Sequence, residues 1–321
     1  MKSNSCTEHD KGAAMKKVFI DGAAGTTGLR IADRLAQRAD LRLLTIDEAR
    51  RKDPAARRDC MNSADVVFFC LPDDAAREAA SLVENKATAV IDTSTAHRTA
   101  DGWVYGFPEL TGQREKIIGA KRVANPGCHA SGFIALVRPL VELGALKADA
   151  ALSCFSLTGY TGGGKRMIAA YEDPETPLSY QAPRQYALSQ SHKHLPEMRV
   201  YTGLAQSPVF CPVVAAFPTG MAVTVPLFSA QTKANLREIR EIYQSYYQSG
   251  VVRFRADADE DGFFTANALS GTDRMEVSAF GNDERMILAA RFDNLGKGAS
   301  GAAIQNMNLL LGADETAGLI I

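Results

Sequence analysis

The sequence predicts an α/β fold, in which a Rossmann-like, doubly wound parallel sheet is followed by an α+β domain with a mostly antiparallel sheet. Three observations favour this fold. Residues 17–126 alternate short β-like runs with runs of helical period. Glycines stand between the first strand and its helix. After about residue 150 most runs read as strands, with few helices between them.

The first half of the chain contains five expected strands separated by helical stretches. The helices are clearest at 26–37 and 73–85, and in the first of them Leu29, Ala32 and Leu35 share one face. Strand, helix and strand in this order imply right-handed crossovers between parallel strands. The expected strands are 17–22, 41–47, 65–72, 88–94 and 121–126.

The second half reads as a sheet with one strong helix, at 232–248, and a long polar loop from Tyr171 to Ser191. One face of this sheet is a candidate surface for self-association. An apolar helix at 299–312 is expected to pack back on the first domain. The expected strands are 151–159, 221–229, 251–257, 275–281 and 285–293, with a hairpin turn at 281–284.

Composition indicates which kind of molecule the protein binds and in which cellular compartment it is expected. A chain of 321 residues that is 46% hydrophobic buries a large core, and its formal charge of -1 lacks the basic excess typical of nucleic-acid binding. We therefore expect a small-molecule partner. The six cysteines form no C-x-x-C pair, which favours reduced thiols and a cytoplasmic protein. The first fourteen residues are polar, and no apolar run approaches the ~20 residues of a membrane-spanning helix.

The stretch "DGAAGTTG" places Gly22, Gly25 and Gly28 between the first strand and its helix. Glycines there allow a tight turn and the close approach of a dinucleotide pyrophosphate to the helix N-terminus. A plain strand-to-helix turn is the alternative. Asp47 at the end of the second strand would suit the ribose hydroxyl of NAD, whereas the basic run at 50–52 suits the 2′-phosphate of NADP. Otherwise, Asp47 caps a short helix and the basic run is solvated.

Cys128 follows a Pro-Gly pair and precedes an apolar pattern of helical period at Phe133, Val137, Leu140 and Val141. The thiol is therefore expected at a helix N-terminus, where unpaired amides and the helix dipole stabilise a thiolate. This position also lies at the carboxyl edge of the parallel sheet, where such folds bind ligands. We interpret Cys128 as a nucleophile beside a nicotinamide ring. The structural alternative, a small buried cysteine, is assigned to Cys60, Cys70, Cys154 and Cys211.

A thiol nucleophile needs a group that moves protons near neutral pH, and "SHKHLPEM" supplies His194 with Glu197 as its orienting carboxylate. His192 and His194 could instead bind zinc, but no other cluster supplies the remaining ligands, so no metal is expected. Arg98 could grip a carboxylate or phosphate, or be a surface arginine. The loop at 162–164, followed by Lys165, is open to an anion or is a simple hinge.

Taken together, these stretches resemble the N-acetyl-γ-glutamyl-phosphate reductases, and more closely the shorter of their two sequence types. The resemblance covers nearly the whole chain from about Lys16 onward. The stretches that carry it, in family order, are "DGAAGTTG", "CLPDDAAREA", "DTSTAHRT", "WVYGFPEL", "NPGCHASGFIALVRPL", "LTGYTGGGKRM", "HKHLPEM" and "DNLGKGASGAAIQNMN".

The resemblance implies NADPH-dependent reduction of N-acetyl-L-glutamyl 5-phosphate to the 5-semialdehyde and phosphate, through a cysteine thioester, in arginine biosynthesis. It implies Cys128 and His194 as catalytic residues and a homo-oligomer, dimer or tetramer. Candidate substrate contacts are Arg98, Thr158, Gly159, Lys165 and Glu197. Candidate cofactor contacts are Gly22, Ala24, Gly25, Thr26, Thr27, Gly28, Arg50, Cys70, Leu71, Pro72, Ser94, Asn294 and Gly298, with Lys297 near the nicotinamide end.

The resemblance also divides the chain and leaves alternatives open. It gives a flexible tail at 1–14, an NADP-binding domain at 15–127 completed by the C-terminal helix at 297–321, and a catalytic and oligomerisation domain at 128–296. Threonines replace two usual serines at 158 and 161, and His129 replaces a usual aromatic, so that it could be a second acid-base group. The alternatives are an aspartate-semialdehyde dehydrogenase-like enzyme and a non-catalytic NADP-sensing protein.

Overall fold

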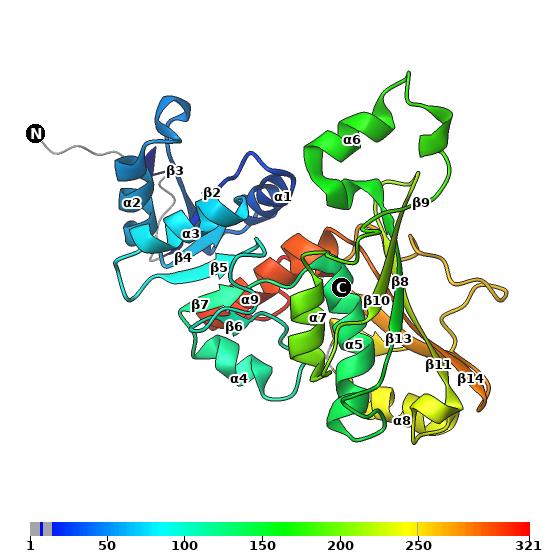
Figure 1. Ribbon diagram of the computed structural model, residues 1–321. Helices are drawn as coiled ribbons and strands as arrows, with labels where there is room; N and C mark the ends of the chain where they lie inside the picture. The colour runs from blue at the N-terminus through cyan, green and yellow to red at the C-terminus, as the bar shows by residue number, and fades with distance from the viewer. Residues whose placement is uncertain (1–6, 9–14, 249) are drawn as a thin grey trace, which may run out of the picture. The chain divides into compact units, whose positions relative to one another are not determined.

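The chain forms two compact units, each built on its own seven-stranded sheet (Figure 1). The structure is a computed structural model that describes residues 7–8, 15–248 and 250–321. Unit 1 runs to Pro126 and takes in Ser300–Leu319, and unit 2 comprises Gly127–Ala299 with the last two residues. Apart from Thr7–Glu8, which form a short strand, the tail expected at 1–14 lies outside the described residues.

The sheet of unit 1 is parallel apart from one edge strand. Its order is β1-β3-β2-β4-β5-β7-β6, and only β1 runs antiparallel to its neighbour. The chain passes from β2 to β3 and then crosses to β4 on the other side of β2, so the switch point lies between β2 and β4. The strands are β1 (Thr7–Glu8), β2 (Lys16–Asp21), β3 (Leu41–Thr45), β4 (Val66–Phe69), β5 (Ala89–Asp92), β6 (Val104–Tyr105) and β7 (Arg122–Ala124).

Helices cover both faces of this sheet because alternate side chains of each strand feed two different cores. Val18 and Ile20 join a core with the first and last helices of the unit, whereas Phe19 joins a second core on the opposite face. The doubly wound fold predicted from the sequence is therefore confirmed. One face carries α1 (Thr26–Leu35), α4 (Gln113–Ile118) and α9 (Gly301–Leu311), and the other carries α2 (Pro54–Ser63) and α3 (Asp73–Leu82).

The sheet of unit 2 is mixed, with an antiparallel majority. Its order is β12-β13-β14-β11-β8-β10-β9, and only the β12–β13 and β8–β10 pairs are parallel. Strand β10 was not predicted, because Pro208, Pro212 and Pro218 flank and interrupt its apolar run. Strand β9 was not predicted because it is two polar residues long. The strands are β8 (Ser153–Gly159), β9 (Arg184–Gln185), β10 (Val209–Ala215), β11 (Met221–Phe228), β12 (Val252–Phe254), β13 (Met275–Gly281) and β14 (Arg285–Phe292).

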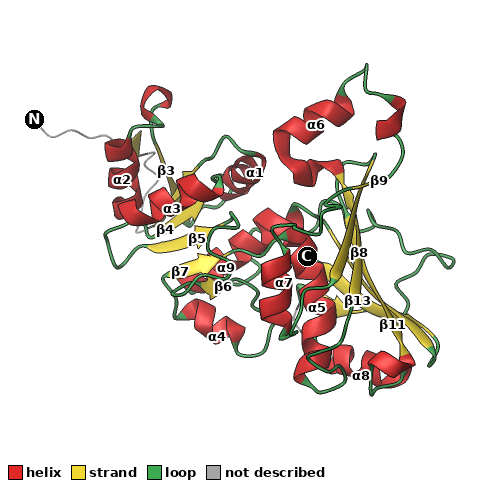
Figure 2. Cartoon of the chain, in the orientation of Figure 1, coloured by secondary structure: helices red, strands yellow, loops and turns green. Residues whose placement is uncertain are grey.

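One long helix packs against this sheet and carries Cys128 as its first residue (Figure 2). The helix approaches β11 closely, since a Cβ on Gly132 would lie 2.5 Å from Val223 Cγ2. A five-residue π-helix, Gly296–Ser300, leads into α9. The helices of unit 2 are α5 (Cys128–Glu142), α6 (Gly164–Glu172), α7 (Leu195–Thr202) and α8 (Leu236–Tyr246).

A proline inside α5 is compensated from a neighbouring helix. Pro139 has no N–H, so the carbonyl of Ala135 loses its helical donor. The hydroxyl of Tyr247 donates to that carbonyl at 2.6 Å, and the hydroxyl of Tyr243 donates to the Leu136 carbonyl at the same distance. Both tyrosines are buried. The contact of α8 with α5 therefore supplies a donor to the carbonyl that the proline leaves without one, and a second donor to its neighbour.

We expect Tyr247→Phe to lower the free energy of unfolding by about 1–3 kcal/mol, because it leaves a buried carbonyl without its donor. Denaturant-induced unfolding measures the change. The matched control is Tyr246→Phe, whose hydroxyl donates to Glu142 at 3.1 Å in an exposed hydrogen bond that should contribute less than about 1 kcal/mol. Equal effects of the two substitutions would contradict this account of Pro139.

Candidate functional site

The glycine loop of unit 1 is shaped by backbone packing at two of its three glycines. Gly22 has φ +88°, and a Cβ there would lie 2.3 Å from the carbonyl oxygen of Cys70. A Cβ on Gly28 would lie 2.5 Å from the carbonyl oxygen of Gly22. A Cβ on Gly25 would meet nothing closer than 3.5 Å. Gly22 and Gly28 are therefore required by the fold, while Gly25 borders open space.

The same loop presents the N-terminus of α1 without a competing side chain. Gly25 is the N-cap, no side chain caps the helix, and the first turn has no acidic residue. The amides of Thr26, Thr27 and Gly28 therefore have no intrahelical acceptors and lie at the positive end of the helix dipole. Pyrophosphate oxygens are suited to this position.

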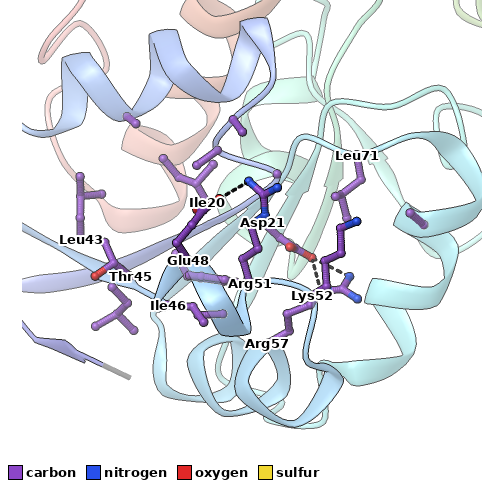
Figure 3. Close-up of a pocket in the computed structure, with 17 residues that line it drawn as sticks. Ile20, Asp21, Leu43, Thr45, Ile46, Glu48, Arg51, Lys52, Arg57 and Leu71 are labelled. Atoms are coloured by element: carbon purple, nitrogen blue, oxygen red, sulfur yellow. Dashed lines mark hydrogen bonds and ion pairs between the residues drawn. The ribbon is translucent and has the colours of Figure 1, made fainter. Parts of the chain in front are cut away.

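A cavity of about 600 Å³ adjoins the loop (Figure 3). Gly22, Ala24 and Leu71 belong to its wall, together with apolar residues at the ends of β2 and β3. Cys70 precedes Leu71, and Pro72 is the N-cap of α3. Burial raises the pKa of the Cys70 thiol to about 12, so this cysteine is not a nucleophile at neutral pH.

A buried ion pair lies in the wall of this cavity. Arg57 of α2 donates from Nη2 to Asp21 Oδ2 at 2.8 Å and from Nη1 to Glu78 at 3.3 Å. Burial raises the pKa of Asp21, while the guanidinium of Arg57 opposes that rise. The pair was missed from the sequence. The available signal was Asp21 itself, an acid at the end of a buried strand that needs a cationic partner.

The basic run after β3 divides between the cavity and the surface. Arg51 and Lys52 line the cavity, whereas Arg50 bonds Asp53 at 2.7 Å and does not line it. Arg51 pairs with Glu48. Lys52 makes no hydrogen bond or ion pair within the described part of the chain. Asp47 is the N-cap of a short 3-10 turn and makes no side-chain bond as a cap.

Asp92, at the end of β5, organises the residues that follow it. Its carboxylate accepts from the Ser94 amide and hydroxyl and lies 2.6 Å from His97 Nδ1. The His97 ring stacks on Trp103 with centroids 4.0 Å apart. Arg98 is buried and donates to the carbonyls of Asn125 and Thr93. The structure therefore places the Arg98 guanidinium among main-chain acceptors rather than on the surface.

In unit 2, Cys128 opens helix α5 as expected. Gly127 is the N-cap with extended backbone, and no side chain caps the helix. The Gly127 amide donates to Glu197 Oε2 at 3.1 Å, which places a buried carboxylate beside the N-terminus of α5. A Cβ on Gly298 would lie 3.0 Å from Cys128 Cβ, so this glycine lies directly against the cysteine side chain. The thiol is half-buried, not enclosed in hydrocarbon.

Aromatic rings surround the residue next to Cys128. The ring of His129 lies 5.5 Å from that of His194 and 5.7 Å from that of His192, and the last two are 4.7 Å apart. Phe210 of β10 packs on His129 and His192. His194 is the N-cap of α7, which contacts α5. The fold thus brings the histidine pair of the sequence to the N-terminal end of α5.

His129 is held in its neutral form. Burial, with a smaller contribution from His192, lowers the pKa of His129 to about 3. Its Nδ1 lies 2.6 Å from Ser156 Oγ and its Nε2 lies 2.7 Å from the hydroxyl of Tyr186. A histidine that stays neutral between pH 5 and 8 is a poor general acid, which argues against His129 as a second acid-base group.

Two protein families together match most of the chain. The family described as "Semialdehyde dehydrogenase, NAD binding domain" matches residues 47–120, and that described as "Semialdehyde dehydrogenase, dimerisation domain" matches residues 128–294. N-acetyl-gamma-glutamyl-phosphate reductase 2 of Nostoc sp. is 46% identical over 318 residues, covering 94% of this chain and 99% of the relative. The Brucella suis N-acetyl-gamma-glutamyl-phosphate reductase is 46% identical over 307 residues, covering 92% and 99%.

The chain belongs to the N-acetyl-γ-glutamyl-phosphate reductase family. Solved structures share its fold. Aspartate semialdehyde dehydrogenase II of Vibrio cholerae, complexed with ASA, superposes with a TM-score of 0.68 at 16% identity, covering 94% of this chain and 99% of that one. The Candida albicans aspartate semialdehyde dehydrogenase with NADP gives 0.66 at 15% identity, with coverages of 92% and 99%. At these identities the likeness concerns the fold alone.

In this member of the reductase family, the loop after β8 is tied to the end of β14. Asn294 accepts from the Gly220 amide and donates to Thr161 Oγ1. A Cβ on Gly159 would lie 2.4 Å from the Pro218 carbonyl oxygen, and Thr158 is buried. Lys165, in the first turn of α6, is exposed. Asn294 therefore positions the loop. Within the loop region, Thr158 is shielded from solvent, whereas Lys165 is accessible to it.

Two findings concern the described residues of this family member as a whole. Within residues 7–8, 15–248 and 250–321, no helix has both the length and the apolar character required to cross a membrane. Over those same ranges, His, Cys, Asp and Glu side chains form no group of three or more that could hold a metal ion.

Tyr186 is a residue of this site that the sequence did not single out. It lies inside the long polar stretch, after the two-residue strand β9, and its hydroxyl reaches His129. The only signal for Tyr186 in the sequence was an aromatic residue within a polar stretch. The contacts of His97 with Asp92 and Trp103 were likewise not visible in the sequence.

We expect Gly25→Ala to weaken binding of a nicotinamide dinucleotide roughly tenfold or more, because the added methyl lies where the pyrophosphate approaches the α1 amides. Calorimetric titration with NADPH measures the dissociation constant. The fold should be preserved, since Gly25 has φ -75° and the added Cβ meets only ordinary contacts. Gly119→Ala, with similar free space at the end of α4, is the control. Unchanged affinity in Gly25→Ala would contradict this placement of the pyrophosphate.

Proposed function

We propose that the chain catalyses NADPH-dependent reduction of N-acetyl-L-glutamyl 5-phosphate to N-acetyl-L-glutamate 5-semialdehyde and phosphate, in arginine biosynthesis. The observation that carries the proposal is a half-buried cysteine at the first position of α5, beside a histidine pair. This arrangement occurs in a chain 46% identical, over 94% of its length, to a relative named for that reaction. Acyl transfer through sulfur needs a thiolate and a proton carrier, and both groups are present.

In the proposed reaction the Cys128 sulfur attacks the acyl carbon, the bond from that carbon to the phosphate oxygen breaks, and inorganic phosphate leaves. NADPH, when bound, supplies the hydride that reduces the resulting thioester. A proton then reaches the acyl oxygen and gives a thiohemiacetal. As the carbon–sulfur bond breaks, that hydroxyl proton passes to the proton-carrying group, the aldehyde is released and the thiolate re-forms. The helix dipole and the first-turn amides of α5 stabilise the thiolate at the start and at the end of this cycle.

We assign the proton transfers to His194. It caps α7, and its ring lies 5.5 Å from that of His129, the residue after the nucleophile. The carboxylate of Glu197 is engaged with the Gly127 amide, which supports a role in fixing the start of α5. Thr158, Gly159, Lys165 and Arg98 remain candidate substrate contacts. Exposed Lys165 is the best placed of these to attract a phosphate, whereas Arg98 holds backbone.

NADP rather than NAD is the cofactor we infer. The NAD-binding family match and the glycine loop support a nicotinamide dinucleotide. Lys52 and Arg51 line the cavity next to that loop, and an ammonium without a partner there suits a phosphate better than a hydroxyl. Arg57 neutralises Asp21, so the cavity wall does not repel an additional phosphate.

We assign dinucleotide binding to residues 15–127 with 297–321, and catalysis and self-association to residues 128–296. The family match to a dimerisation domain supports a homo-oligomer. In unit 2, strand register places Phe155 and Ile287 on the face opposite the buried Val223, and both are more than 40% exposed. Val209 of β10 shares that face and is 59% exposed. An exposed apolar sheet face of this kind supports dimerisation through it. Free thiols at the described cysteines support a cytoplasmic protein.

The nearest alternative is an aspartate-semialdehyde dehydrogenase, whose fold the chain shares. A coupled assay decides between the two substrates: N-acetylglutamate semialdehyde or aspartate semialdehyde is supplied with phosphate and with NADP or NAD. We expect turnover with the acetylated substrate, because a pocket for a neutral amide should reject a charged ammonium. A non-catalytic NADP sensor would turn over neither, and it would have no use for a thiol beside two imidazoles.

Removal of the nucleophile gives the direct test of the covalent route. We expect Cys128→Ala to lower phosphate-dependent NADP reduction by about 10⁴-fold or more while NADPH affinity stays within twofold, roughly the accuracy of a titration. Cys211→Ala, which removes a half-buried thiol from β10, serves as the control and should keep its activity. Substantial activity in Cys128→Ala would rule out the thioester.

Cofactor choice gives a separate test. We expect Lys52→Ala to raise the KM for NADP roughly tenfold to a hundredfold and to leave the KM for NAD nearly unchanged, because one charge-assisted contact to the 2′-phosphate is lost. Arg50→Ala is the matched control, since its guanidinium binds Asp53 outside the cavity. If Arg50→Ala has the larger effect, the phosphate lies elsewhere on the basic run.

A further inference from the structure

Three side chains around the nucleophile form a hydrogen-bonded row that the proposed chemistry does not use. Ser156 of β8, His129 of α5 and Tyr186 after β9 are joined in that order by contacts of 2.6 and 2.7 Å. Ser156 is fully buried and His129 nearly so, while Tyr186 is half-buried. The row therefore runs from the buried Ser156 to a half-buried tyrosine hydroxyl, through the residue that follows Cys128 in α5.

The segment that carries Tyr186 is fixed to the edge of β10 by unusual backbone and side-chain contacts. The Tyr186 amide donates to the Pro212 carbonyl, and the Gln190 side chain both donates to and accepts from the backbone of Phe210. Ala187 and Gln190 hold φ values of +52° and +57°, a strained region for residues other than glycine. Strain of this kind persists only where surrounding contacts over-determine the backbone, as it often does at functional sites.

The hydroxyl of Ser156 decides which nitrogen of His129 carries the proton. Within the described residues, His129 is the only hydrogen-bond partner of the Ser156 hydroxyl. If Ser156 accepted from His129, its own buried hydrogen would be orphaned, and an orphaned donor costs more than an unused acceptor lone pair. Ser156 therefore donates to Nδ1. A neutral imidazole then carries its hydrogen on Nε2, which donates to the Tyr186 oxygen.

We propose that Ser156 and His129 are positioning residues that orient the Tyr186 hydroxyl so that it donates a hydrogen bond to the Cys128 thiolate. With its oxygen accepting from His129 Nε2, Tyr186 has no described acceptor for its own hydrogen. The Cys128 thiolate is a strong acceptor at this end of α5, where the Glu197 carboxylate accepts from the Gly127 amide. Tyr186 thus adds a side-chain donor to the helix amides that hold the sulfur ionised.

The electrostatics of the site agree with this geometry. Burial raises the pKa of Tyr186, and the nearby Cys128 charge raises it further, so the phenol keeps its proton. His129 stays neutral, as shown above. Other ionisable groups at this end of α5 are His192 and His194, whose rings contact His129, and Glu197 of α7, whose carboxylate accepts from the Gly127 amide. Asp293 and Lys297 belong to the segment whose Gly298 lies against the cysteine.

The proposal deepens the proposed function, which supplies the nucleophile, but its test needs no substrate. Alkylation of the full chain by iodoacetamide, measured against pH and corrected with Cys128→Ala, reports the ionisation midpoint of the Cys128 thiol. We expect Tyr186→Phe to raise that midpoint by roughly one pH unit, the effect of losing one hydrogen bond to a charged group. Tyr246→Phe on α8 is the matched control and should leave the midpoint unchanged.

The row makes two further variants informative. His129→Phe keeps an aromatic ring but removes both contacts, so it should raise the midpoint like Tyr186→Phe and add little in the double variant. Ser156→Ala leaves Tyr186 and His129 in place and should still raise the midpoint, by a smaller amount, because the proton is no longer fixed on Nε2. An unchanged midpoint in Tyr186→Phe, additive shifts in the double variant, or no shift in Ser156→Ala overturns the proposal. Substantial activity of Cys128→Ala in the coupled assay would instead contradict the proposed function, whereas these midpoints test the hydrogen-bonded row by itself.

Discussion

The close packing of helix α5 on the sheet of unit 2 determines where the nucleophile lies. Gly132 leaves no room for a side chain against Val223, so the helix packs directly on β11 with its first residue at the sheet end. Tyr247 supplies a donor to the carbonyl that Pro139 leaves without one, and Tyr243 a second donor to its neighbour, so the helix remains continuous through the proline. The position of Cys128 is thus a consequence of core packing, and its reactivity is a consequence of where the helix begins.

In unit 1, one set of charged side chains is paired in the interior and another lines the cavity. Asp21 would be a costly buried anion without Arg57, and Arg57 would be a buried cation without Asp21 and Glu78. Their mutual neutralisation leaves Arg51 and Lys52 as the basic groups at the cavity wall. Removing either side chain of the buried pair would weaken the packing of α2 on the sheet. It would also change the electrostatic potential in the cavity.

Much of the fold could be predicted because the spacing of apolar residues along the chain indicates which positions of a strand or helix are buried. The strands of unit 1 are continuous apolar runs, and the start of α5 at Cys128 followed from a Pro-Gly pair before a helical pattern. Strand β10 was not predicted because three prolines, at 208, 212 and 218, flank and interrupt its apolar run. Helices α6 and α7 were not predicted because they follow glycine-rich or polar stretches. In the site, the sequence pointed to Cys128 and His194 but not to Tyr186, whose role arises from long-range pairing with His129. No local pattern encodes that contact.

The way Gln190 binds β10 has a consequence beyond the site. Strand β9 pairs with only two residues of β10, so most of that strand would otherwise present unpaired backbone at the rim of the sheet. The amide of Gln190 occupies the N–H and the carbonyl of Phe210 as a neighbouring strand would, and Pro212 has no N–H to offer. A foreign chain therefore finds few backbone groups to pair with along this edge. The segment that holds Tyr186 also shields the molecule from edge-to-edge aggregation.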